Sequence, residues 1–266
     1  MRWLEELTGS VRAGTEEGQV DANAGFVVTR RGALLVDAFS APADGRPLYE
    51  AARTEAGQVV GLVYTHEHGD HVFGSADYPD DLLILASRDT AAGLRAAVDR
   101  YAEDIARYGL VARFPTLEFE ARVVLPWEPE IVIAELGGHA RGSTVVFVPS
   151  THVLFAGDLV FAAGAAWVGH GDLDRWIAAL RELEGWGATR VVPGHGPVGG
   201  PEVLTRQRQW LESFAGRLGQ LRADGEPAGA ALTRLVEEFE LNEKNGYNER
   251  LWGVLETALR ERFGFS

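Results

Sequence analysis

Histidine is scarce in this chain of 266 residues, yet three of its seven histidines fall within six positions. They are His66, His68 and His71 of the segment HEHGDH, which also contains Asp70. His66 and His68 are two positions apart, so in extended backbone both imidazoles point to the same side. Gly69 then allows a sharp turn that brings Asp70 and His71 toward a neighbouring point. This pattern predicts metal ligands, and the alternative is a solvated polar turn.

Three further residues of ligand type follow apolar runs that end in glycine. They are His139 after AELGG, Asp158 after VLFAG, and His195 after VVPG. Each residue alone would be interpreted as part of a turn. Together with HEHGDH, however, they supply five imidazoles and two carboxylates. That set is large enough to hold two divalent ions and to leave positions open for water.

The elements that must position these residues are strands followed by helices. The apolar, β-branched run 59–65 is typical of a buried strand, and HEHGDH begins at its carboxyl end, where open α/β sheets place their sites. Further strands are predicted over 25–30, 33–39, 81–87, 117–125, 130–136, 143–148, 152–158 and 188–194. Helices are predicted over 47–56, 88–108 and 172–184, and from 201 onward with an interruption at 223–229. This order predicts a layered α/β body with a helical tail.

Composition excludes several classes of function. With 25 Lys and Arg against 39 Asp and Glu, the net charge of −14 argues against binding to nucleic acid. No apolar run approaches eighteen residues, so no membrane span is expected, and the first residues lack the apolar core of a secretory signal. We therefore expect a cytoplasmic protein. The absence of cysteine excludes disulfides, thiolate nucleophiles and iron–sulfur clusters.

Four segments together resemble the metallo-β-lactamase-fold hydrolases. They are HEHGDH, the GGHARGS around His139, the FAGD ending in Asp158 and the PGHGP around His195, and the match runs from about Val20 to Pro197 in the family's order. The resemblance implies a four-layer αββα sandwich, with metals at one edge between the sheets, over residues 1–200. Residues 201–266 would form a helical extension packed on the same domain. The aromatic residues of this extension would either shape the entrance or fill the core: Trp210, Phe214, Tyr247 and Trp252.

The resemblance also implies a role for each candidate ligand. One ion would be held by His66, His68 and His139. The second ion would be held by Asp70, His71 and His195. Asp158 would bridge both ions, and Asp37 would orient the ligands. We expect two divalent ions, zinc in the first place, with manganese or iron as alternatives.

Two departures from the family's pattern bear on the substrate. β-Lactamases that carry the HxHxDH motif have no bridging carboxylate where Asp158 stands, so the name of the fold is a poor guide to the substrate. The family also often has proline where this chain has Arg141. The guanidinium of Arg141 would attract an anionic substrate group, unless it forms a surface ion pair. His170 is a second candidate substrate contact, with an ordinary loop residue as the alternative.

The function expected from these observations is that of a dinuclear metallohydrolase. A hydroxide shared by the metals and oriented by Asp158 and Asp70 would cleave an ester, thioester, lactone or amide of a small molecule. Phosphodiesters also fit, whereas long nucleic acids are disfavoured by the acidic charge. One alternative is an iron-dependent oxidoreductase similar to the persulfide dioxygenases, which hold a single iron. A metal-free binding protein is a third alternative, and the sequence leaves the oligomeric state open.

Two competing motifs carry little weight. Gly194, Gly196 and Gly199 satisfy the G-x-G-x-x-G pattern, but no strand follows to complete a dinucleotide-binding βαβ unit. Ser143 lies near His139 but lacks the G-x-S-x-G context of a serine hydrolase.

Overall fold

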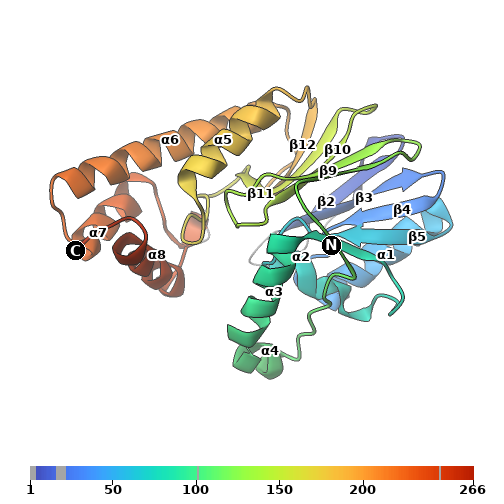
Figure 1. Ribbon diagram of the computed structural model, residues 1–266, viewed down its shortest axis with the longest axis horizontal. Helices are drawn as coiled ribbons and strands as arrows, with labels where there is room; N and C mark the ends of the chain where they lie inside the picture. Colours follow the sequence, from blue (N-terminus) through green and yellow to red (C-terminus); the bar gives the residue numbers. More distant parts are fainter. Residues whose placement is uncertain (1–3, 16–21, 101, 246) are drawn as a thin grey trace.

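The computed structural model describes residues 4–15, 22–100, 102–245 and 247–266, which form two β-sheets flanked by helices (Figure 1). The first sheet follows chain order: β1 (Leu4–Thr8), β2 (Val11–Thr15), β3 (Asn23–Thr29), β4 (Gly32–Val36), β5 (Val59–Val63), β6 (Ile84–Ser87) and β7 (Leu117–Phe119). The second sheet has the order β12 (Arg190–His195), β11 (Val153–Phe161), β10 (Thr144–Val148), β9 (Ile131–Glu135) and β8 (Arg122–Leu125). Strands β4 to β7 are parallel neighbours, as are β11 and β12.

Alternating side chains pack the two sheets face to face. In β9, Ile131 and Ile133 belong to a buried cluster that also contains residues of β4, β5 and β6 in the first sheet. Val132 and Ala134 of the same strand belong to a different cluster, shared with helices. Because successive side chains of a strand point to opposite faces, each sheet buries one face against its partner and the other against helices.

Helices cover both outer faces. On the first sheet lie α1 (Pro42–Ala56) and α3 (Arg88–Arg100), followed by α4 (Ala102–Tyr108). On the second sheet lie α5 (Leu173–Glu184) and α6 (Glu202–Ala223). Figure 1 shows the two helical groups on opposite sides of the paired sheets. The fold is therefore the four-layer αββα sandwich that the family resemblance implied.

The last helices share a core with the second sheet. After α6 come α7 (Ala228–Glu238) and α8 (Glu249–Glu261). Leu211 and Phe214 of α6, Leu235 of α7 and Leu259 of α8 belong to the same buried cluster as Val132 of β9. Within the described ranges, no helix has the length and hydropathy needed to cross a membrane.

The segment predicted as one strand over 117–125 is in fact two strands in different sheets. β7 pairs with β6 in the first sheet, and β8 pairs with β9 in the second. Between them Ala121 adopts a φ of 58°, a left-handed conformation that turns the chain from one sheet to the other. An alanine carries no sequence signal for this conformation, so the alternating pattern gave no warning of the break.

Other boundaries differ by a few residues. Helix α1 begins at Pro42, five positions earlier than predicted, because proline is well suited to the first turn of a helix. The predicted helix over 88–108 appears as α3 and α4, with residue 101 between them outside the described residues. Asp172 caps α5 as predicted, since its carboxylate accepts the backbone N–H of Arg175.

Replacing Phe214 by alanine tests whether α6 belongs to the core of the sandwich. The side chain is fully buried, so Phe214→Ala is expected to lower the free energy of unfolding by about 3–5 kcal/mol. Urea denaturation followed by circular dichroism measures the change, and a single transition should shift as a whole. The neighbouring surface substitution Ser213→Ala, on the exposed face of α6, should change stability by less than about 0.5 kcal/mol. Two separate transitions, only one of them shifted, would contradict the shared core.

Candidate metal centre

The HEHGDH segment leaves the carboxyl end of β5 and enters a short helix. Residues 64–68 follow the strand, and α2 (Gly69–Val72) carries Asp70 and His71. His66 and His71 are almost fully buried, at 1% and 0% exposure. The segment is therefore folded into the interior at the end of a buried strand, as the sequence predicted.

The other three ligand-type residues come from the second sheet. His139 lies in the loop after β9, and His195 is the last residue of β12. Asp158, however, does not stand at a strand end, because β11 continues to Phe161. The register between β11 and β12 is irregular at Gly157, whose φ is 53°. The side chain of Thr65, which follows β5 in the first sheet, packs against Gly157. This bulge turns the Asp158 carboxylate toward the edge where the other ligands lie.

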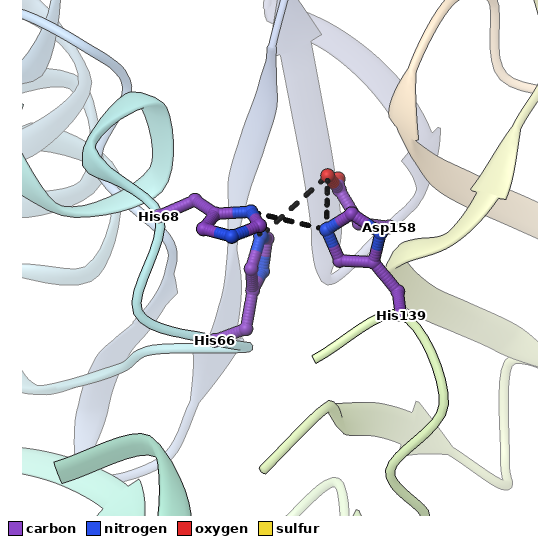
Figure 2. Close-up of side chains that lie close together, drawn as sticks. All are labelled: His66, His68, His139 and Asp158. Carbon is purple, nitrogen blue, oxygen red and sulfur yellow. Dashed lines mark hydrogen bonds and ion pairs between the residues drawn. The ribbon is translucent and has the colours of Figure 1, made fainter. Parts of the chain in front are cut away.

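The first group of side chains consists of His66, His68, His139 and Asp158 (Figure 2). His68 Nδ1 lies 3.0 Å from His66 Nε2 and 3.0 Å from His139 Nε2. Asp158 Oδ2 lies 3.5 Å from His66 Nε2 and 3.3 Å from His139 Nε2. Four potential donor atoms thus face one another, all within 4.8 Å.

The second group consists of Asp70, His71 and His195, and Asp158 contacts this group as well. Asp158 Oδ1 lies 3.1 Å from His71 Nε2, and Oδ2 lies 3.4 Å from His195 Nε2. Asp70 Oδ2 lies 3.3 Å from the same His195 nitrogen. The Asp158 carboxylate therefore stands between the two groups.

Outer contacts fix the imidazoles with Nε2 facing inward. His71 Nδ1 lies 2.9 Å from Asp37 Oδ2, His66 Nδ1 lies 3.0 Å from Thr65 Oγ1, and His139 Nδ1 lies 3.1 Å from the carbonyl oxygen of Trp167. Asp37 also accepts the backbone N–H and the hydroxyl of Thr65, at 2.7 and 2.8 Å. An imidazole whose Nδ1 donates outward keeps its Nε2 lone pair for a metal.

The electrostatics of the site suit a cation. Burial lowers the pKa of His139 to about 3 and holds the pKa of His68 well below its usual value, so both rings are neutral at pH 7. Burial alone would raise the pKa of Asp158, but the imidazoles of His195 and His71 outweigh it and lower that pKa. For His195 itself, the carboxylates of Asp158 and Asp70 outweigh burial and raise the pKa to about 10. The carboxylates are thus ionised, and positive charge is favoured between them.

Two buried polar atoms point to a missing partner. His71 Nε2 and Asp158 Oδ1 lie 3.1 Å apart but form no hydrogen bond with each other or with any other described residue, although both are shielded from water. Leaving a buried donor or acceptor unpaired is costly, so such atoms call for an explanation. A metal ion bound by the His71 imidazole and the Asp158 carboxylate would satisfy these two atoms. Imidazole and carboxylate donors match the preferences of zinc and similar ions.

Residues 18–195 match the model of the metallo-beta-lactamase superfamily. The chain belongs to this superfamily. Its members' fold, together with the clustered His and Asp side chains, implies a divalent metal. Asp37, Asp158 and His195 lie within the matched residues, and their individual roles stay predictions.

Known members of the superfamily include hydrolases. The chain is 27% identical over 137 residues to a beta-lactamase-like protein 2 homolog of Caenorhabditis elegans, an alignment that covers 52% of this chain and 42% of the other. The chain thus spans less than half the length of that relative. It is 29% identical over 217 residues to a hydroxyacylglutathione hydrolase of Polaromonas sp., covering 79% and 74% of the two chains. The metallo-beta-lactamase structure from Pontibacter korlensis superposes with a TM-score of 0.66 at 23% identity, covering 80% of this chain and 99% of the other. That likeness concerns the fold.

The two candidate substrate residues are both exposed but contact different partners. The Arg141 side chain is 81% exposed, and its Nε lies 3.0 Å from Asp89 Oδ2, which corresponds to the ion-pair alternative. His170 is exposed, and its Nδ1 lies 3.4 Å from Nε2 of His68. Contact of either residue with substrate stays a prediction.

Sequence reasoning missed the roles of Thr65 and Trp167. Thr65 directly precedes HEHGDH, but a threonine after a strand carries no signal of a role beside an imidazole. Trp167 acts through its carbonyl oxygen, which every residue possesses, so nothing in the sequence could have found it.

Asp37→Asn tests the outer support of the site. The asparagine keeps the shape but replaces one acceptor oxygen with an NH₂ group, so it cannot accept all three hydrogen bonds. We expect the affinity for one of two zinc ions to fall about 10- to 100-fold, measured by competition with a chelator. The exposed Asp77→Asn serves as the control and should leave zinc affinity unchanged. Equal zinc affinity in Asp37→Asn and the wild type would show that Asp37 does not support the site.

Proposed function

We propose that this protein is a dinuclear metal-dependent hydrolase that cleaves an ester, thioester, lactone or amide bond in a small molecule. The observation that carries the proposal is the position of Asp158, whose carboxylate lies within 3.5 Å of imidazole nitrogens from both groups. A carboxylate placed between two sets of ligands is suited to bridge two cations. One cation alone would leave one of the groups unused.

Each of the two groups of side chains is proposed to hold one metal ion. His66, His68 and His139 would hold one ion, Asp70, His71 and His195 would hold the other, and Asp158 would bridge them. When bound, two divalent ions supply a hydroxide at neutral pH and polarise the oxygen of the scissile group. Zinc is the proposed ion, with manganese or iron as alternatives.

The chain's own residues orient the reaction. The Asp70 side chain is 21% exposed against 4% for Asp158, so Asp70 is more open to solvent and to substrate. We assign Asp70 Oδ2 the role of accepting a hydrogen bond from the attacking water, and Asp158 the role of a second carboxylate that orients this water. Both carboxylates have a lowered pKa, because nearby imidazoles outweigh the effect of burial, and both are therefore ionised acceptors at pH 7.

The proposed substrate class follows from the relatives and from charge. A relative named hydroxyacylglutathione hydrolase supports hydrolysis of a small acyl compound, although sequence identity is only 29%. The net charge of −14 disfavours long polyanions such as nucleic acids. Because one fold serves many reactions, the substrate must be found by experiment.

Asp158→Asn tests the bridging role. The substitution keeps the shape but removes the charge that offsets the repulsion between two cations about 3.5–4 Å apart. We expect the metal content to fall from about two ions per chain toward one, and hydrolysis to fall by at least about 100-fold. Elemental analysis and turnover measurements decide the matter, and circular dichroism should show an intact fold. Two tightly held ions with near-normal turnover in the variant would remove Asp158 from the bridge.

A screen of the zinc-loaded protein tests the reaction class. Lactones, thioesters, esters, β-lactams and phosphodiesters are offered in parallel, and removal of metal with a chelator should abolish any activity that zinc restores. Metal content and oxygen uptake are recorded in the same preparation. One iron per chain with oxygen consumption would overturn the hydrolase and favour the oxidoreductase alternative. Hydrolysis without oxygen uptake supports the proposal.

A further inference from the structure

A segment between β11 and α5, residues 162–172, touches two of the proposed metal ligands. The carbonyl oxygen of Trp167 lies 3.1 Å from His139 Nδ1, and His170 Nδ1 lies 3.4 Å from His68 Nε2. Figure 2 shows His68 and His139 facing each other across the first group. The inward nitrogens of both rings are thus set by partners on this one segment.

The same segment is held by residues on either side of α8 (Glu249–Glu261). The hydroxyl of Tyr247 donates to the carbonyl oxygen of Ala166 at 2.6 Å, and its ring centroid lies 5.5 Å from that of Trp167. Tyr247 is only 1% exposed, so water cannot easily replace this hydrogen bond. Tyr247 thus holds Ala166, the residue directly before Trp167, whose carbonyl oxygen contacts His139.

Arg262, directly after α8, forms a second attachment. Its Nη1 donates to the carbonyl oxygen of Gly169 at 3.1 Å, and its Nη2 donates to that of Gly171 at 2.8 Å. These two carbonyls flank His170. The planar guanidinium, with several fixed donors, is well suited to hold two carbonyls at once.

His71, in the second group of ligands, has a support of a different origin. His71 is oriented by Asp37, which follows β4 in the first sheet, on the other side of the sandwich from the C-terminal helices. A carbonyl orients an imidazole only as firmly as its own peptide is held. The C-terminal residues therefore support His68 and His139 of the first group through the 162–172 segment. In the second group, His71 is held by Asp37 of the first sheet, and His195 is the last residue of β12.

We propose that Tyr247 and Arg262 are positioning residues that set the affinity for the ion bound by His66, His68 and His139. They act through the 162–172 segment and not by contact with the ion. The helical extension would thereby tune one of two metal positions. This inference rests on the metal-binding part of the proposed function and is independent of the hydrolytic part.

The test measures metal affinity in Tyr247→Phe and Arg262→Lys of the full chain. Tyr247→Phe removes one hydroxyl, and Arg262→Lys keeps the charge but cannot hold two carbonyls in the same way. Metal-free protein is titrated with zinc against a chelator, and with cobalt(II), whose visible absorption reports the geometry of its ligands. We expect one of two sites to weaken about 3- to 10-fold and its cobalt spectrum to change, while the other site keeps its affinity.

Two control variants lie in α8, the helix that Tyr247 and Arg262 flank. Trp252 donates its indole N–H to the carbonyl oxygen of Leu241 at 2.7 Å, inside the extension, so Trp252→Phe removes a comparable hydrogen bond. Arg260 pairs with Glu256 on α8, so Arg260→Lys is matched to Arg262→Lys. Both controls should bind zinc and cobalt as the wild type does, even where thermal unfolding shows lower stability.

Several outcomes would overturn the inference. Wild-type affinities and cobalt spectra in Tyr247→Phe would do so, even if Arg262→Lys failed to fold. Equal weakening of both sites, or the same loss in Trp252→Phe, would reduce the effect to general destabilisation. If the wild type bound metal but hydrolysed nothing, the proposed reaction would fail and the inference would stand. If the wild type bound no divalent ion, both would fail.

Discussion

A carboxylate buried among imidazoles is the interaction on which this structure depends. Asp158 is 4% exposed, and its two oxygens lie 3.1–3.5 Å from nitrogens of four histidines. An ionised carboxylate taken out of water is costly unless positive charge or hydrogen bonds compensate for it. The surrounding imidazoles compensate in part. His71 Nε2 and Asp158 Oδ1, two buried atoms of the site without a hydrogen-bond partner among the described residues, mark where a cation would complete the compensation. The fold must therefore deliver four separate segments to one point.

The stacking of two sheets makes this delivery possible. The first sheet contributes the segment after β5, and the second contributes the loop after β9, the interior of β11 and the end of β12. The inter-sheet core fixes the distance between these contributions, since side chains from β4, β5 and β6 interdigitate with those from β9 to β12. The register irregularity at Gly157 turns Asp158 toward the partner sheet. The site thus depends on packing far from the metal ligands.

Membership in the superfamily leaves the substrate open for a physical reason. The ligands come from the two sheets, whereas the surroundings of the site come from loops and from the helices after β12, the parts of a fold that vary most readily. In this chain the helical extension shares the core of the second sheet and reaches the site through Tyr247 and Arg262. Phe214 and Tyr247, two of the aromatic residues considered for the entrance, are in fact buried at 0% and 1% exposure.

The sequence by itself determined the ligand types, the order of the elements and the layered architecture. HEHGDH could be recognised as a metal-binding pattern because its spacing and the preceding apolar strand are local properties of the sequence. The alternating and helical patterns of hydrophobic residues predicted most elements within a few residues. Only the tertiary structure decided how the ligands meet. The break at Ala121, the bulge at Gly157 and the carbonyl of Trp167 have no local signature, because each follows from the packing of segments distant along the chain. The shared position of Asp158 between both groups is likewise a property of the assembled sheets, since its neighbours are separated from it by up to 92 residues in sequence and become adjacent only when the core forms.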